Sequence, residues 1–549
     1  MSPTPYRMPT ALFDAIAAGA GGAPALHLLA RAEHSRRLAC AYAVTVAARE
    51  AGGTVAEAAE HAWALFTDVT RTTPEATTAA LTHPSAGPAL FGLLANLRNP
   101  DDQLPPPVHW FTALAVSAAA RAGLPTRAEL PLTGSWVALP SLGRAHFPDA
   151  RPGDRAEVRV DETGHCHITT PDNTVTVPGL PYNDAPLDGP PRGLSSTTPG
   201  LPYNGRPLDS PPRDPSNTPP EPPYNKALLS SPPHDSSSTA PDLPHAEGQS
   251  PNSPGTTARW HGPHLLTTLD GGAPLLLDTL DPPCFPHSAP HPEGLGPAEV
   301  RRWAAQAEDA CRLLRADHPE AYAELAAGPH LLVPLTRPGH GNRSGSSAET
   351  FGCMALSPPT SATGLAVTLT HEMQHNKLAA LLHLFDLFEP SGPERFYAPW
   401  RPDPRPLPGL LHGAYAHLGV ARFWERRRET EPDPALRATA HAQFARWRLA
   451  AHEATTVTLS SGRLTPLGHR FAEHMLTTLD TLCGLPVPAP ALRHAESAAR
   501  AHRTAWQHRN ANAPHQPQAR QPQSHQAPAQ QPPLQQPSTR TPPTRKLSA

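Results

Sequence analysis

The sequence predicts a mainly α-helical protein, in which a helical domain in the C-terminal half carries a metal-site motif. Long Ala/Leu-rich stretches repeat apolar residues at spacings of three and four, the period of an amphipathic helix. Short β-branched runs are confined to one part of the chain, which predicts only a small β element. Proline is concentrated in one internal segment and in the C-terminal tail, which marks these as segments without a packed core.

Composition excludes several classes of protein. The 549 residues include 74 Pro and 37 Gly without a collagen period, and the net charge of −3 excludes binding of nucleic acid by bulk charge. Apolar runs stay far below the roughly 18 residues that span a bilayer, so we expect no membrane partner. The first ten residues lack an apolar core and the six cysteines are scattered, so we expect no secretory signal and a cytoplasmic location.

The N-terminal third divides into two expected parts. Residues 1–130 are expected to form a helical N-terminal region, because apolar residues recur there at helical spacing. Residues 131–178 are expected to form a small β element, because β-branched runs alternate there with Gly, Pro and Asp turns.

Two further segments are expected to lack a core. Residues 179–258 contain three Pro-Tyr-Asn units whose tyrosines, Tyr182, Tyr203 and Tyr224, are 21 residues apart. The units lack the apolar residues that a solenoid would bury, which favours a disordered Pro-rich linker; the alternative is a platform on which each unit docks a partner. Residues 501–549 are expected to form a disordered Gln/Pro-rich tail.

Residues 259–500 are expected to form the metal-site domain. Helices are predicted at 297–314, 362–388, 410–428, 434–459 and 465–482. The second of these contains His371-Glu372-Met373-Gln374-His375, an H-E-x-x-H motif. Residues four apart on a helix project from one face, so His371 and His375 can bind one metal ion through neutral imidazoles.

Glu372 lies beside this pair, where it can act as a general base on metal-bound water or hold a ligand. The flanking residues are mostly apolar, so the helix is expected to be buried, and buried histidines with a glutamate are costly without a partner such as a metal. The alternative is that these histidines meet by chance in a core of a His-rich chain.

The further ligands of a zinc peptidase are hard to place. Leu378 stands where a metzincin has glycine. Glu394 follows a Gly-Pro loop, and Glu425 belongs to a charged helix end, so neither is a convincing glutamate ligand.

A histidine is the better candidate for a third ligand. His417 shares an apolar stripe with Leu410, Ala414, Ala421 and Trp424, so it is expected to face the core. His412 lies off that stripe near the start of the same helix and remains the second candidate. A lone histidine on an apolar face is also compatible with a hydrogen-bonded core residue.

The connection at 395–406 combines aromatic residues, arginines and rigid prolines. Next to a metal, Arg401 or Arg405 can present a guanidinium to a carboxylate through two hydrogen bonds, so both are candidate cofactor-binding residues. The alternative is a surface loop with solvated arginines, which is favoured for Arg395.

These residues carry a family resemblance. Segment 344–353 and the run from Leu365 to Leu378 resemble the HEXXH-motif proteins of ribosomally synthesised peptide pathways in actinomycetes, and 396–406, 409–424 and 461–466 strengthen the likeness. The family is similar to the Fe(II)- and 2-oxoglutarate-dependent peptide β-hydroxylases. The resemblance covers 260–490 well and the N-terminal helices loosely.

The resemblance implies hydroxylation of a Cβ–H bond in a precursor peptide. It also implies that this peptide is a partner, and it suggests a radical-SAM peptide maturase as a second partner. It implies Fe(II) held by His371, His375 and a third ligand, with 2-oxoglutarate anchored by Arg401 or Arg405. Two alternatives remain open from the residues alone: a zinc metallopeptidase based on the H-E-x-x-H, and a non-catalytic accessory protein that binds through its Pro-Tyr-Asn repeats.

Overall fold

The computed structural model describes residues 7–99, 107–151, 153–177, 208–209, 258–285, 295–328, 330–338, 342–390, 392 and 394–511. The Pro-rich segment expected at 179–258, with its repeats, and the tail from residue 512 lie outside the described residues, apart from 208–209 and residue 258. Thirteen α-helices dominate the described part of the chain, so the predicted mainly α class is confirmed. Among the described helices, none is by itself long and apolar enough to cross a membrane, and one bent pair, Thr10–Ala17 with Gly22–Ala51, meets that test jointly.

The N-terminal region is helical as far as Ala122. Its helices are α1 (Thr10–Ala17), α2 (Gly22–Ala51), α3 (Gly53–Thr72), α4 (Pro74–Thr82), α5 (Ala86–Arg98) and α6 (His109–Ala122). Gly52 separates α2 from α3 and Gly53 begins α3; their φ values of 74° and 60° are ones that glycine adopts without steric penalty. A two-stranded pair of β1 (Arg7–Met8) and β8 (Leu208–Asp209) lies beside α1.

The β-branched runs form two small antiparallel sheets that pack on α6 and form one core with α3–α6. The first has the strand order β2-β5-β6-β7 and the second β3-β4-β9. Their bounds are β2 (Thr126–Pro131), β3 (Trp136–Leu139), β4 (Gly143–His146), β5 (Arg155–Val160), β6 (Cys166–Thr169), β7 (Thr174–Val177) and β9 (Arg259–His261). Strand β9 follows the Pro-rich segment in the chain, so the β element is completed by residues outside the expected range of 131–178.

The metal-site domain contains a sheet that the sequence analysis did not predict. Its strand order is β10-β11-β12-β14-β13, with β11, β12 and β14 parallel. The strands are β10 (His264–Thr268), β11 (Pro274–Leu277), β12 (Leu331–Pro334), β13 (Ser344–Gly345) and β14 (Cys353–Leu356). Helices α7 (Pro297–Asp317) and α8 (Pro319–Ala327) connect β11 to β12. Strands β12 and β14 are buried at every position, so they lack the alternation that identifies a strand in a sequence.

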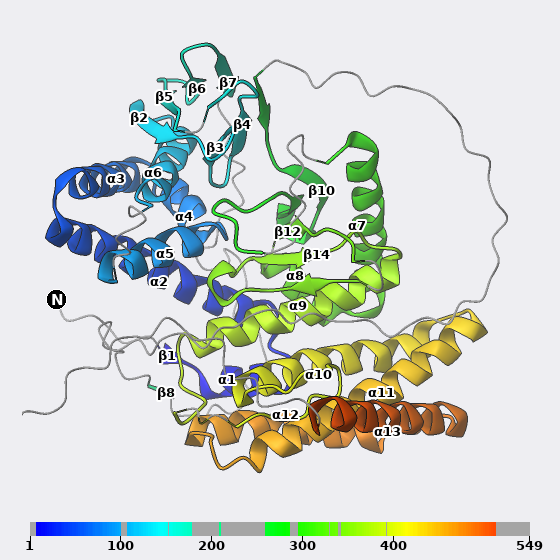
Figure 1. The fold of residues 1–549 in the computed structure, drawn as a ribbon. Helices are drawn as coiled ribbons and strands as arrows, with labels where there is room; N and C mark the ends of the chain where they lie inside the picture. The colour runs from blue at the N-terminus through cyan, green and yellow to red at the C-terminus, as the bar shows by residue number, and fades with distance from the viewer. Residues whose placement is uncertain are drawn as a thin grey trace, which may run out of the picture.

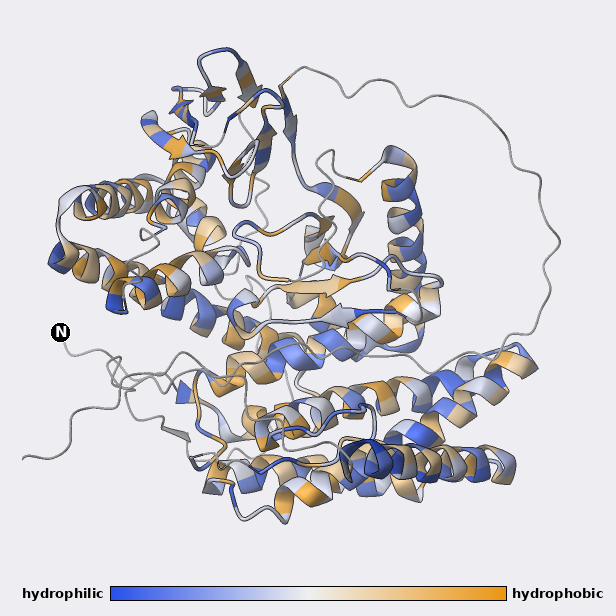
Figure 2. Cartoon of the chain, in the orientation of Figure 1, coloured by the Kyte–Doolittle hydropathy of each residue, from blue (hydrophilic) through white to orange (hydrophobic). Residues whose placement is uncertain are grey.

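The C-terminal helices are α9 (Ala362–Leu382), α10 (Leu407–Thr430), α11 (Pro434–Leu459), α12 (Pro466–Gly484) and α13 (Ala489–Ala511). Four of them occur where they were predicted, although α9 ends at residue 382 and not at 388; the fifth, α13, was not predicted. Figure 1 shows α9 between the sheet and a layer formed by α10–α13. Helix α13 runs past the tail boundary expected at residue 501. Figure 2 shows that α13 is mainly hydrophilic, which explains why its sequence was assigned to the tail.

The N-terminal region and the metal-site domain share a hydrophobic core. Phe13 of α1 meets Phe385 and Phe471 edge to face, with ring centroids 5.7 and 5.9 Å apart. The first turns of α2 belong to the same cluster as α9, α10 and α12. The chain segment before residue 30 therefore helps to position the helices that carry the candidate site.

Candidate metal centre

Helix α9 carries the H-E-x-x-H motif through the interior of the protein. It begins at Ser361, whose hydroxyl accepts a hydrogen bond from the Gly364 amide at 3.1 Å, as an N-cap does. From His371 to Leu378 every side chain is buried, polar and charged ones included. A helix with so many buried polar groups must satisfy them internally, because water does not reach them.

The two histidines of the motif meet at one point. His371 Nε2 and His375 Nε2 lie 3.1 Å apart. Two nitrogens that bind one ion at about 2.0–2.1 Å lie about 2.8–3.4 Å apart for bond angles between 90° and 109°, so the observed separation fits a shared ion. Burial lowers the pKa of His371 well below its usual value and that of His375 to about 4, which keeps both rings neutral at pH 7, the form that binds metals.

Glu372 is fully buried, and only one of its two carboxyl oxygens accepts a hydrogen bond from a described residue. Its Oε2 accepts a hydrogen bond from Ser346 Oγ at 2.5 Å, whereas Oε1 has no partner among the described residues. Burial raises the pKa of Glu372 to about 7, although the hydrogen bond from Ser346 acts in the opposite direction. A buried carboxyl oxygen without a partner is costly, so Oε1 is a place where a further polar ligand would be stabilised.

Asn376 ties this part of α9 to the sheet. Its amide nitrogen donates to the carbonyl oxygen of Cys353 at 3.1 Å, and its amide oxygen accepts from the Gly352 amide at 3.1 Å. Strand β14 and the segment that carries Ser346 are thereby fixed relative to Glu372. The sequence analysis assigned no role to Asn376, Ser344 or Ser346, although Asn376 directly follows the motif.

His417 faces the same interior as His371. The two rings are nearly perpendicular, with centroids 5.1 Å apart, and His417 is 2% exposed, as its place on the apolar stripe predicts. Its Nδ1 lies 2.8 Å from the carbonyl oxygen of Gly413, which can only accept, so Nδ1 carries the proton and Nε2 has a free lone pair. This hydrogen bond fixes the tautomer that a metal ligand needs.

His412 lies near the other histidine of the motif. Its ring is roughly parallel to that of His375, with centroids 5.8 Å apart, and burial lowers its pKa to about 3. Within the described residues, no three His, Cys, Asp or Glu side chains already surround one point as a metal requires. A three-histidine site therefore requires a side-chain adjustment that moves His417 or His412 toward the pair.

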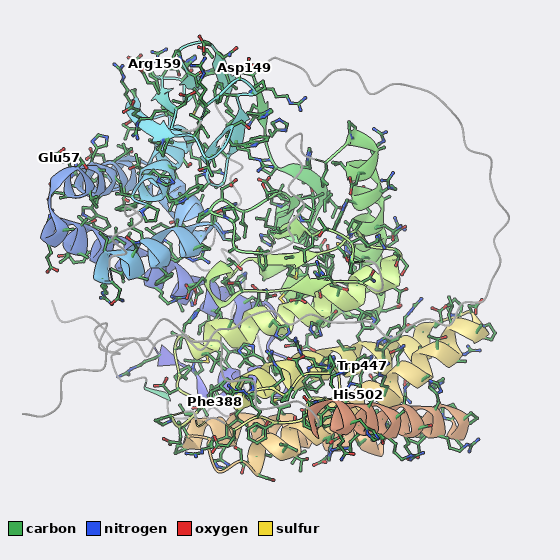
Figure 3. All side chains as sticks on the ribbon, viewed as in Figure 1. Glu57, Asp149, Arg159, Phe388, Trp447 and His502 are labelled. Atoms are coloured by element: carbon green, nitrogen blue, oxygen red, sulfur yellow. The ribbon has the colours of Figure 1, made fainter. Side chains whose placement is uncertain are left out.

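Two tryptophans enclose His417. Trp400 and Trp447 both stack on the imidazole of His417. Each ring centroid is 4.5 Å from that of His417, and the ring planes differ by 23° and 29°. Figure 3 labels Trp447 on α11. Trp400 fits because position 413 is glycine: a Cβ there would stand 2.2 Å from Trp400 Cζ2. The three rings exclude water from this side of the site.

The arginine loop lies across the start of α10, and its two candidate arginines differ. Arg401 makes two hydrogen bonds to Asp403, at 2.9 and 3.2 Å, so its guanidinium is occupied within the loop. Arg405 is 3.7 Å from Asp403 and lies over Gly409, where a Cβ would stand 3.1 Å from its guanidinium. The charge of Arg405 also helps to lower the pKa values of His375 and His412, so the guanidinium acts electrostatically on both rings.

Helix α13 holds this loop from outside. Tyr397 Oη lies 2.9 Å from His502 Nδ1, and Asn510 Nδ2 donates to the Pro402 carbonyl at 3.2 Å. Arg503 lies over the Tyr397 ring, 4.3 Å from its centroid. Figure 3 labels His502 on α13. These supports were missed because the sequence around residue 501 was expected to be tail.

The glutamates that a zinc peptidase would use lie elsewhere. Glu394 pairs with Arg463 at 2.9 Å in an exposed position. Glu425 lines a separate cavity on the far side of α10. A histidine, not a glutamate, is therefore the neighbour that the fold supplies to His371 and His375.

No family model matches the sequence, and no curated protein matches it. The candidate site therefore stands on its own geometry.

Proposed function

We propose that this protein is a metal-dependent peptide-modifying enzyme of the cytoplasm, an Fe(II)- and 2-oxoglutarate-dependent β-hydroxylase of a ribosomally synthesised precursor peptide. The observation that carries the proposal is the 3.1 Å approach of His371 Nε2 and His375 Nε2 in the interior, with the buried ring of His417 centred 5.1 Å from that of His371. Three protein ligands that leave positions open suit a non-haem iron oxygenase.

The residues fit the donor requirements of such a site. The three imidazoles would hold the metal through Nε2, with His417 oriented by its Nδ1–H bond to Gly413. When bound, Fe(II) and 2-oxoglutarate would supply the activation of O₂ for oxygen insertion into a Cβ–H bond. Glu372 offers its free Oε1 as a hydrogen-bond acceptor inside the site, and Ser346 holds its other oxygen in place.

Arg405 is the better candidate to bind a carboxylate of 2-oxoglutarate. Its charge acts on His375 and His412, and its 3.7 Å contact with Asp403 is longer than the two hydrogen bonds that Arg401 makes to the same carboxylate. A guanidinium can replace such a long contact with two short hydrogen bonds to an incoming carboxylate. Arg401 then holds the loop by fixing Asp403.

The test uses anaerobically purified protein loaded with Fe(II) and supplied with 2-oxoglutarate, O₂ and the peptide encoded nearby. Mass spectrometry is expected to find one added oxygen atom in the peptide, dependent on 2-oxoglutarate and lost in His371→Ala. In this reaction one atom of O₂ enters the peptide and the other enters succinate, with release of CO₂. A radical-SAM peptide maturase encoded beside the protein is the expected partner on the same peptide.

The second candidate is a zinc metallopeptidase, which the H-E-x-x-H motif alone would favour. If the zinc-loaded protein cleaves the peptide and adds no oxygen atom to it, the protein is a peptidase and not a hydroxylase. Both enzymatic proposals fail if neither product forms and His371→Ala supports the peptide maturase as well as the wild type does. The protein is then an accessory factor.

A further inference from the structure

A cavity lies on the faces of α9 and α10 that point away from the candidate metal ligands. It has a volume of about 730 Å³ and is lined by the loop after α1 and by residues of α7–α10 and α12. None of the candidate metal ligands lines it. The volume falls within the range of about 300–1,000 Å³ that is typical of sites for small organic ligands.

The cavity has an apolar floor with an aromatic wall. Leu314, Leu369 and Met373 contribute buried apolar surface. His318 stacks on Phe423 with centroids 4.2 Å apart and planes at 12°. Burial lowers the pKa of His318 to about 4, so its ring is neutral at pH 7 and does not repel a cation.

Most of the charged side chains that line the cavity form ion pairs with described residues, and one carboxylate does not. Asp317, Glu320 and Glu324 line the cavity and are paired with Arg427, Arg422 and Lys377, respectively. Arg426, which also lines it, pairs with Glu429. Among the charged side chains of described residues that line the cavity, Glu425 alone forms no ion pair within 4.0 Å, although Arg428, Arg426 and Arg422 act on it electrostatically from farther away.

One hydrogen-bond acceptor in the wall of the cavity, the amide oxygen of Gln374, also has no donor among the described residues. Gln374 is 3% exposed and donates through Nε2 to the Gly19 carbonyl at 3.0 Å, but its Oε1 has no partner. An unpaired buried amide oxygen is costly, and a ligand that donates a hydrogen bond would remove this cost. Two unused oxygen acceptors above an apolar floor therefore define the chemistry of the cavity.

We propose that this cavity binds an alkylammonium group, with the ammonium at Glu425 and Gln374 and the apolar chain on the floor beside the His318–Phe423 stack. The same group occurs in a free amine and in the lysine side chain of a peptide. The site is independent of the proposed metal chemistry, because no candidate metal ligand lines it.

The test measures binding of hexylammonium to the full chain by calorimetry, with hexanoate as the probe of opposite charge. Glu425→Gln keeps the shape and removes the charge, and Thr477→Trp fills the cavity from an exposed position of α12. Each is expected to weaken binding by at least about tenfold, the effect of losing one charged hydrogen bond or the space for the chain. Circular dichroism verifies that both variants are folded.

Thr456→Trp is the matched control. Thr456 and Thr477 are both exposed helical threonines whose hydroxyls donate to the carbonyl four residues earlier at 2.9 Å, but Thr456 does not line the cavity. The control is expected to bind hexylammonium like the wild type. Tighter binding of Nα-acetyl-lysine methylamide than of hexylammonium assigns the site to peptide lysines, and the reverse order assigns it to free amines. Equal binding of hexanoate, unchanged binding in both variants, or no saturable binding of either ammonium probe overturns the proposal.

Discussion

Gly419 of α10 lies directly against Gln374 of α9: a Cβ at position 419 would stand 2.6 Å from Gln374 Cγ. The absence of a side chain at 419 lets the two helices approach closely beside His417 and His371. The distance between the histidine-bearing helices is therefore set by a glycine that makes no polar contact with the site.

Gly419→Ala is expected to push α10 away from α9. Overpacking of this kind costs about 1–3 kcal/mol of stability, and the displaced His417 is expected to weaken metal binding as well. Gly92→Ala is the matched control, because Gly92 is also within a helix but has open space around its Cβ position. The control is expected to stabilise the protein by up to about 1 kcal/mol, as alanine does in a helix. Chemical denaturation and Co(II) titration of both variants measure the two effects; equal behaviour of the two would contradict the close-approach argument.

Alanine variants of the two competing histidines are expected to separate their roles. His417→Ala is expected to lower Co(II) affinity by at least about 100-fold, the upper end of what loss of a supporting residue costs a metal site. His412→Ala is expected to lower it by less than about tenfold. Optical titration with Co(II) reports both values. The opposite order would assign the third ligand to His412.

Lys377→Met is expected to destabilise the fold strongly. Lys377 is fully buried, and its Nζ donates to Glu324 Oε1 at 2.7 Å and to the Ala20 carbonyl at 3.1 Å. Loss of one partner leaves the other charge buried and costs about 3–5 kcal/mol. The double variant Lys377→Met/Glu324→Leu is expected to recover most of this loss in urea denaturation. Arg71→Met, which breaks an exposed pair with Asp68, is the control and is expected to cost less than about 1 kcal/mol.

Stability is expected to fall with acid through Glu33. Burial alone would raise the pKa of Glu33, but contact with His383 and the charges of Arg36 and Arg37 lower it to about 2, and Glu349 faces Arg36 from the opposite segment. A lowered carboxyl pKa stabilises the fold at pH values above about 4.5, and this contribution is lost as the pH falls toward 2. Glu33→Gln is expected to be about 3 kcal/mol less stable than the wild type at pH 7, with the difference shrinking below pH 4.5. A difference that is constant from pH 7 to pH 3 would exclude this pairing.

Truncation after residue 500 is expected to loosen the arginine loop. It removes His502, Arg503 and Asn510, which contact the loop at Tyr397 and Pro402. Limited proteolysis is expected to cut within 395–406 in this variant. Truncation after residue 511 keeps α13 and is the control that should resist cleavage there. Equal protection of both chains would mean that α13 does not hold the loop.

Most helices and the burial of the motif could be predicted from the sequence, because the apolar residues that flank the motif in α9 and the apolar stripe of α10 are local information. The same stripe placed His417 in the interior, where it is 2% exposed. The sheet β10–β14 could not be predicted, since its strands are short and its central strands β12 and β14, buried at every position, carry no alternation.

The supports of the site come from positions that are distant in the chain. Ser346 reaches Glu372, and α13 reaches Tyr397, through tertiary contacts that no local pattern encodes. Arg405 and Trp400 lie over Gly409 and Gly413, respectively, and leave little room for a Cβ atom there. This requirement for glycine depends on tertiary contacts and cannot be read from the local sequence. The preference for Arg405 over Arg401 likewise required the position of Asp403.

The central claim is tested most directly by the metal content of protein loaded anaerobically with Fe(II) and freed of excess metal. The account predicts one iron ion per chain in the wild type, and loss of this ion in His371→Ala and in His417→Ala, with both variants still folded by circular dichroism. Wild-type protein without stoichiometric metal, or unchanged iron in both variants, would contradict it.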